Sequence, residues 1–112
     1  MSGCNLRVAS DIPRSASTTT NFNNSLGNAL PNLPAATLRR PTGNVLGRAN
    51  VAIFIMHPYS SSVNYMGCTL LAQRGFTTLC ADSEFTNNPN GYYGYEQHAP
   101  GIKSAIDYLR NA

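Results

Sequence analysis

The 112-residue chain contains no tryptophan and few charged side chains. Asp, Glu, Lys and Arg make up 12% of the sequence, about half of the usual share. Such a composition leaves few solubilising groups and favours association. The net charge of +3 is uneven: residues 1–50 hold five arginines against one aspartate, whereas residues 51–112 hold three cations against four carboxylates. The arginines are not interleaved with aromatic residues, so we expect no nucleic-acid partner.

Cysteine and histidine are too scarce and too scattered for a metal site. The cysteines, Cys4, Cys68 and Cys80, form no C-x-x-C pair, and the two histidines are far apart in the sequence. An odd number of cysteines also argues against a disulfide framework. Cys68 and Cys80 lie within apolar patterns, so we expect small core residues there. The sequence predicts neither a metal nor a cofactor.

Long apolar runs are also missing. No run approaches the ~18 residues that a membrane-spanning helix needs, and the first residues lack the apolar segment of a secretory signal peptide. The start of the chain is rich in Arg, Ser and Thr and poor in acids, which is typical of mitochondrial transit peptides, but it shows no amphipathic stripe. We therefore predict a cytoplasmic protein without a membrane span, with a mitochondrial location as the alternative.

A change in composition near residue 50 divides the chain. Residues 1–44 are rich in Ser, Thr, Asn and Pro, and such a segment buries too little apolar surface to offset the entropy lost on ordering. We expect it to be flexible and mostly irregular. Short extended pieces at 36–38 and 45–46 remain candidates for edge strands. Residues 45–112 are predicted to form an incomplete α/β domain.

Two strands with a helix between them are expected first in this domain. The apolar run Val51–Met56 is typical of a central parallel strand that is buried on both faces. Apolar residues then recur with helical spacing at 63, 66, 70 and 71; the serines at 60–62 offer an N-cap, and Gly75 ends the helix. The stretch FTTLCAD, residues 76–82, reads as the second strand.

A loop and a second helix complete the expected order. Residues 83–95 form a long loop with an Asn-Pro-Asn-Gly turn. Ile102, Ala105, Ile106 and Leu109 then have the spacing of an amphipathic helix, with Pro100 in its first turn. The order predicts a parallel strand-helix-strand-helix unit. Because two strands do not make a stable sheet, we expect poor stability of the isolated chain and self-association through exposed sheet edges.

The stretch VAIFIMHPYSSSVNYMGCTLLAQRGFTTLCADSEFTNN resembles the front part of an α/β-hydrolase. In that family a buried strand ends in a His-Gly-type motif, a helix follows with an LAxRGF/Y ending, and the next strand ends in an acidic residue. The resemblance covers about residues 45–112. It implies a serine-type hydrolase that cleaves an ester or acyl bond of a small molecule.

The same resemblance assigns roles to the loop after the first of these strands. It implies that His57 structures the loop. Pro58 stands where glycine is usual and has no N–H to donate, so the backbone N–H of Tyr59 becomes the expected oxyanion donor, with Ser60 next in line. Serine nucleophiles of this family lie on a G-x-S-x-G elbow.

No G-x-S-x-G occurs in the chain, which also lacks the acid and base that follow the elbow in the family. The sequence therefore predicts an inactive N-terminal fragment of an α/β-hydrolase. The alternative is a non-catalytic α/β binding module derived from a hydrolase. A nucleotide-binding half-fold is disfavoured because neither G-x-G-x-x-G nor a P-loop is present.

The remaining polar residues have plain structural interpretations. We expect the serines at 60–62 to cap a helix rather than act as nucleophiles. Asp82 and Glu84 are expected to be solvated residues at a strand end, and His98 to lie at a helix entry. The tyrosines at 92, 93 and 95 either border a substrate cleft or pack over their loop.

Overall fold

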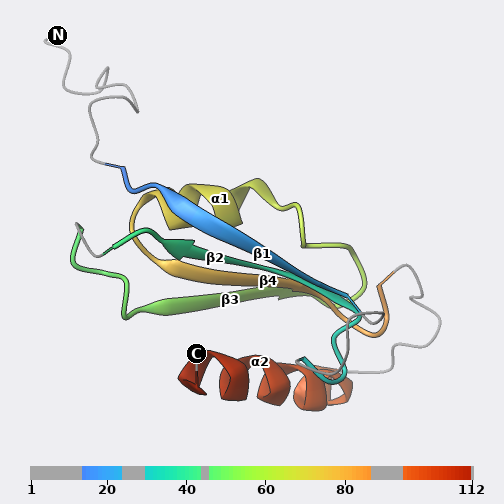
Figure 1. Cartoon of the computed structure of the whole chain (residues 1–112). Coiled ribbons are helices and arrows are strands. Elements are labelled where there is room, and N and C mark those ends of the chain that lie inside the picture. The colour runs from blue at the N-terminus through green and yellow to red at the C-terminus, as the bar shows by residue number, and fades with distance from the viewer. Residues whose placement is uncertain (1–13, 24–29, 44–45, 87–94, 112) are drawn as a thin grey trace, which may run out of the picture.

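The computed structural model describes residues 14–23, 30–43, 46–86 and 95–111. It contains a four-stranded sheet with one helix on each face, as Figure 1 shows. The elements in chain order are β1 (Ser17–Asn23), β2 (Ala35–Pro41), β3 (Ala52–His57), α1 (Met66–Gln73), β4 (Thr77–Asp82), the 3-10 helix η5 (Tyr95–His98) and α2 (Ala99–Asn111).

The strands lie in the order β1-β2-β4-β3. β3 and β4 are parallel and are connected through α1, which confirms the expected parallel strand-helix-strand unit. β2 pairs antiparallel with both β1 and β4, so the sheet is mixed. The chain is thus an α/β protein, in which the predicted parallel pair is extended by two antiparallel strands.

The first part of the chain supplies half of this sheet. β1 and β2 both come from residues 1–44, so the segment predicted to be mostly irregular contains an unexpected strand at 17–23 and a second strand at 35–41, around the extended piece expected at 36–38. The extended piece expected at 36–38 lies in β2. Leu46 is outside any strand, and residue 45 lies outside the described residues. Strand pairing with β4 explains the difference, because β2 buries Ala36, Thr37 and Leu38 there.

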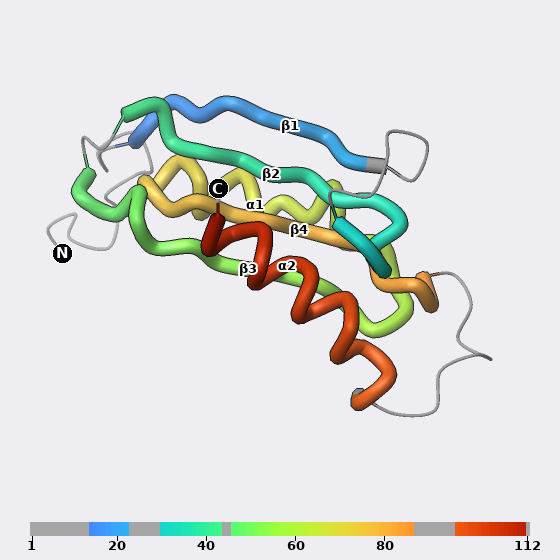
Figure 2. The backbone as a smooth tube through the Cα atoms, turned by 60° about the horizontal axis from the view of Figure 1, so that its bottom comes forward, coloured from blue at the N-terminus to red at the C-terminus, as the bar shows by residue number. Residues whose placement is uncertain are grey.

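β3 lies at an edge of the described sheet, whereas a central position was expected. The tube in Figure 2 shows it on the outer side of β4. Its four inner residues are only half-buried, and Val51, just before it, is 46% exposed. β4 takes the central place instead, with Leu79, Cys80 and Ala81 fully buried. An apolar run alone does not distinguish a strand at the edge of a sheet from one in its interior.

The larger core lies between the sheet and α2. Leu38, Leu79 and Ala81 from the two middle strands pack with Ala105 of α2. The rings of Phe22 and Tyr108 meet edge to face, with centroids 5.4 Å apart. This core joins residues of all four strands to α2, and it fixes α2 against the sheet.

A disulfide joins α1 to the other face of the sheet. Cys68 of α1 is bonded to Cys80 of β4, and both are fully buried. Both are core residues as predicted, but the argument against a disulfide is wrong for this pair, because the helix places the Cα of Cys68 6.4 Å from that of Cys80, within bonding range. Thr78 adds a second tie, since its hydroxyl donates to the Cys68 carbonyl at 3.1 Å.

The start of α1 differs from the expectation and its end agrees with it. The helix begins at Met66, after Tyr65, and has no side-chain cap, so the prediction that the serines at 60–62 cap it is wrong. Those serines are held elsewhere, as described below. At the other end Gly75 has φ +96° and its N–H donates to the Ala72 carbonyl at 3.0 Å. Gly75 thus ends the helix as predicted.

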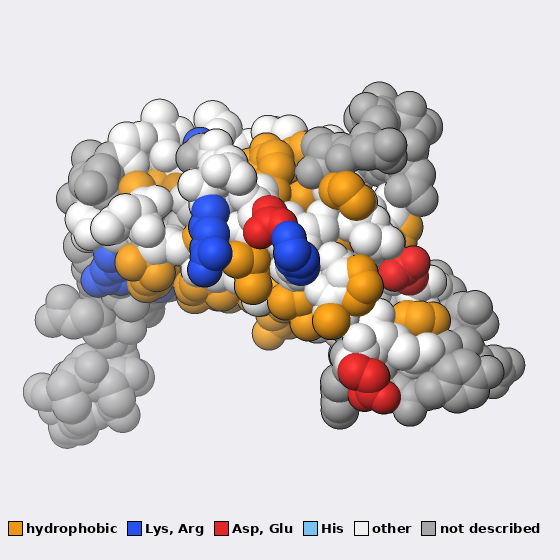
Figure 3. All heavy atoms as spheres, turned by 90° about the horizontal axis from the view of Figure 1, so that it is seen from below, with side chains coloured by type: hydrophobic (Ala, Val, Ile, Leu, Met, Phe, Trp, Pro, Cys, Tyr) orange, Lys and Arg blue, Asp and Glu red, His pale blue; other side chains and the backbone are white. Residues whose placement is uncertain are grey.

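Helix α2 confirms the predicted amphipathic helix, with Pro100 in its first turn. Ala105 is fully buried, whereas Ile102 and Ile106 of the same apolar stripe are 37% and 40% exposed. Figure 3 shows this side of the molecule, where acidic and basic side chains alternate between hydrophobic ones. The described structure therefore leaves part of the apolar face of α2 uncovered.

Candidate functional site

The candidate site lies where the two parallel strands end. β3 and β4 run in the same direction, as Figure 1 shows. His57 at the end of β3 is paired in register with Asp82 at the end of β4. The loop 58–62 leaves β3 at this point. In open α/β sheets, ligands bind outside the carboxyl ends of the strands. The fold therefore places the loop 58–62 at the end of the sheet where α/β proteins usually bind their ligands.

His57 organises this loop through its imidazole. Its Nδ1 accepts the backbone N–H of Tyr59 at 3.1 Å and that of Ser60 at 2.9 Å. Because Nδ1 is an acceptor in both bonds, a neutral ring carries its proton on Nε2. The ring also meets that of Tyr59 edge to face, with centroids 4.8 Å apart. Two successive N–H groups thus converge on one acceptor atom.

Asp82 holds the C-terminal end of the loop 58–62. Its Oδ1 accepts the hydroxyl of Ser61 at 2.9 Å and the backbone N–H of Ser62 at 2.8 Å. Ser62 is buried, and its Oγ accepts the backbone N–H of His57 at 3.1 Å. Bonds to a carboxylate are stronger than those between neutral groups. The carboxylate of Asp82 therefore fixes the serines to β4 instead of leaving them to cap α1.

Ser83 holds the N-terminal end of the loop 58–62. Its hydroxyl donates to the carbonyl of Pro58 and accepts the backbone N–H of Phe85 at 3.0 Å. Ser83 is 1% exposed, so the loss of either bond would leave a buried polar group unpaired. Both ends of the loop are thus attached to residues that follow or end β4.

The three residues assigned from the sequence, His57, Tyr59 and Ser60, are brought together on the surface. All three are exposed, Tyr59 by 42%. The hydroxyl of Ser61 is directed at Asp82, so it does not form a serine–histidine pair with the imidazole. The backbone N–H groups of Tyr59 and Ser60 and the hydroxyl of Ser61 are thus all engaged within the loop or by Asp82.

Asp82 and Ser83 were not recognised from the sequence as part of the site. Asp82 is half-buried and binds the loop rather than standing free in solvent. The predicted parallel pairing of the two strands could have indicated their role, because it places the ends of β3 and β4 side by side. Glu84 is exposed, as expected of a solvated residue at a strand end.

The other candidates lie apart from this loop or outside the described residues. His98 is buried in η5, just before α2, and its ring meets that of Phe85 edge to face at 5.5 Å. The tyrosines at 92 and 93, the side chain of Tyr95, the Asn-Pro-Asn-Gly turn and Cys4 lie outside the described residues. The substrate cleft that the tyrosines were expected to border stays a prediction.

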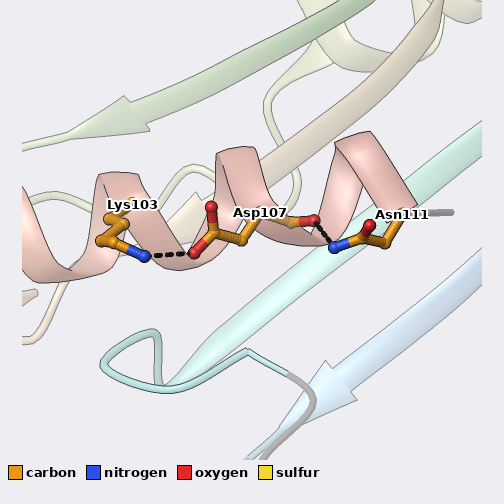
Figure 4. A network of polar contacts seen from close by, with 3 residues as sticks. All are labelled: Lys103, Asp107 and Asn111. Atoms are coloured by element: carbon orange, nitrogen blue, oxygen red, sulfur yellow. Dashed lines mark hydrogen bonds and ion pairs between the residues drawn. The ribbon is translucent and has the colours of Figure 1, made fainter.

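A groove along α2 has a volume of about 520 Å³. Figure 4 shows part of its wall, where Lys103 pairs with Asp107 at 2.6 Å and the Asn111 amide donates to the Asp107 carbonyl at 2.8 Å. The ion pair is exposed and stabilises little. None of the residues assigned to the loop site lines this groove. Its lining consists of Pro31, Asn32, Pro100, Lys103, Ser104, Asp107, Tyr108 and Asn111.

Within the described ranges, no group of three or more His, Cys, Asp or Glu side chains is placed to hold a metal ion. No helix among the same residues is long and apolar enough to cross a bilayer. The chain matches no protein-family model, and no curated protein sequence matches it.

Proposed function

We propose that this chain is the N-terminal part of an α/β-hydrolase, in which the loop 58–62 contributes to the oxyanion hole for an ester or acyl substrate. One observation carries the proposal. Two successive backbone N–H groups, those of Tyr59 and Ser60, converge on a single atom at the end of a parallel strand. An oxyanion hole needs donors that point at one oxygen position.

The surroundings of these N–H groups support the same function. The loop is fixed at both ends by Asp82 and Ser83, so its donors are held in place before a ligand arrives. A donor that is already oriented needs no reorganisation as charge develops on the substrate. The order His57, α1, the AQRGF ending and Asp82 is the one that carries the resemblance to the family.

The geometry also sets a condition on the proposal. The atom on which the two N–H groups converge is Nδ1 of His57. An oxyanion takes this place only after the imidazole turns away. In a complete hydrolase, a further donor and the nucleophile come from the elbow, which the 112 residues do not contain. We therefore expect no ester hydrolysis by the chain itself.

The alternative function is a non-catalytic α/β module that binds a partner or a small ligand. One observation favours it: both N–H groups already have an acceptor within their own loop. In that case His57 serves only to shape the loop, and no elbow sequence exists downstream.

The transcript beyond the codon for Ala112 separates the two functions. The hydrolase proposal requires an in-frame G-x-S-x-G shortly downstream, whereas a stop codon there refutes it and leaves the binding module. The 112-residue chain should neither hydrolyse p-nitrophenyl acetate nor react with a fluorophosphonate. Turnover that a serine-directed phosphonate abolishes would contradict both functions.

The longer polypeptide then tests the donor directly. Tyr59→Pro removes the N–H of residue 59, and we expect kcat to fall by about 10²–10³, the usual loss for one oxyanion donor. Tyr59→Phe is the matched control, because it keeps the N–H and the ring and should leave kcat close to that of the wild type. Equal kcat values for both variants would remove Tyr59 from the oxyanion hole.

A further inference from the structure

The two edges of the sheet differ in chemistry. β1 has the sequence STTTNFN, and its described side chains are exposed except Phe22, which is half-buried. β3 has the sequence AIFIMH, with five apolar residues and no proline, glycine, acidic residue, lysine or arginine. Natural proteins usually protect an open edge with charges, proline or a bulge. The β3 edge has none of these features and is suited to pairing with another strand.

Both faces of β3 are also apolar. Phe54 and Met56 point toward α2 and pack against its core, without being fully buried. Ile53 is paired with Thr78, whose hydroxyl binds α1, so Ile53 and Ile55 point to the opposite face. A strand with half-buried apolar residues on both faces is typical of the interior of a sheet.

We infer that two copies of this chain pair through β3, antiparallel about a two-fold axis perpendicular to the sheet, and form one continuous eight-stranded sheet. Each copy contributes its four strands. With the axis at Phe54, the two Phe54 residues lie opposite each other, and Ile53 lies opposite Ile55 of the second copy. Residues directly opposite in an antiparallel pair point to the same face, so apolar residues meet on both sides.

The charges next to β3 favour this antiparallel arrangement. Near its start lies the exposed Arg48, whose Nη1 donates to the backbone carbonyl of Arg74 at 3.3 Å, which places a cation at that end. Near its end lie Asp82, in register with His57, and the exposed Glu84. A two-fold axis brings the basic end of one copy to the acidic end of the other. Parallel pairing would bring like charges together and is disfavoured.

The second copy competes with another possible occupant of the same edge. In a longer hydrolase, a further strand of the same polypeptide can add to β3. The two occupants exclude each other, so the dimer is expected of the 112-residue chain. The inference does not depend on catalysis, and its test needs no active enzyme.

The test is the mass of the chain in solution, measured by light scattering after size exclusion over a wide range of concentrations. The monomer has a mass of 12.0 kDa, and we expect twice that value for the wild type. Ile53→Lys should restore the monomer mass, because it puts a cation in the new interface. Thr19→Lys on β1 is the matched control, since Thr19 is exposed on the other edge, and it should remain a dimer.

A second variant covers the case in which Ile53→Lys does not fold. Ala52 is exposed at the start of β3, so Ala52→Lys should keep the far-ultraviolet spectrum of the wild type and still weaken the dimer at least tenfold. A wild-type monomer at every concentration would overturn the inference. So would dissociation by Thr19→Lys but not by the β3 variants, or growth beyond the dimer, because two-fold pairing closes.

Discussion

Reduction of the Cys68–Cys80 disulfide should cost this chain a large part of its stability. The bond joins residues 12 apart in the sequence, one in α1 and one in β4. Cross-linking a loop of this length removes conformational entropy from the unfolded chain worth about 3 kcal/mol at 25 °C. A typical domain has only about 5–15 kcal/mol of stability, so the loss decides whether the fold persists.

The structure suggests that other contacts of α1 do not compensate. Only Cys68 and Ala72 are buried in this helix, whereas Met66 and Leu70 are 69% and 48% exposed. The N-terminus of α1 has no side-chain cap. We therefore expect α1 to lose its order first on reduction, before the sheet unfolds.

Urea unfolding followed by circular dichroism, with and without a phosphine reductant, measures this loss. With a urea dependence of about 1–3 kcal/mol per molar, the midpoint should fall by about 1–3 M. A Cys68→Ala/Cys80→Ala variant is the control, and the reductant should not move its midpoint. Equal midpoints for oxidised and fully reduced wild type would refute the reasoning. Because the cytoplasm keeps thiols reduced, the reduced chain is the form expected in that compartment.

Three further predictions test other parts of the fold. Asp82→Ala removes the acceptor of two loop bonds and should cost about 1–3 kcal/mol; unchanged hydrogen exchange in the loop would count against its role. Gly75 has φ +96° and lies close to a leucine side chain, whereas Gly43 has φ +80° and open space around it. Gly75→Ala should therefore destabilise the protein more than Gly43→Ala. Equal urea midpoints for the two variants would contradict this. Leu79 is fully buried, so Leu79→Ala should lower the free energy of unfolding by about 2–5 kcal/mol. Leu70 is exposed, so Leu70→Ala should lower it much less. Similar losses for the two variants would contradict this.

The elements after residue 50 were predictable because their patterns are local. The apolar run of β3, the glycine after α1 and the spacing in α2 each appear within a few residues. The position of β3 in the sheet was not predictable, because an apolar run shows that a strand is buried by something but not which neighbours flank it. β4 has Thr77 and Thr78 within it and is nevertheless the central strand.

β1 and the disulfide were missed for different reasons. The three threonines of β1 favour strands, but the surrounding Ser and Asn residues suggested irregular chain, and only pairing with β2 orders it. The bond between Cys68 and Cys80 depends on how α1 crosses the sheet, which spacing alone does not reveal. In the loop site, His57, Tyr59 and Ser60 followed from the resemblance, whereas Asp82 and Ser83 required the register of β3 and β4.

The central place of β4 has a consequence for the order in which the protein folds during synthesis. β1 and β2 emerge from the ribosome first and can pair as neighbours, and β3 and α1 follow, but the strand that joins β2 to β3 is made last. Until Asp82 has emerged, β2 and β3 have no common partner and both expose edges. Because contacts between distant segments form slowly, this interval is when the nascent chain is most exposed to aggregation.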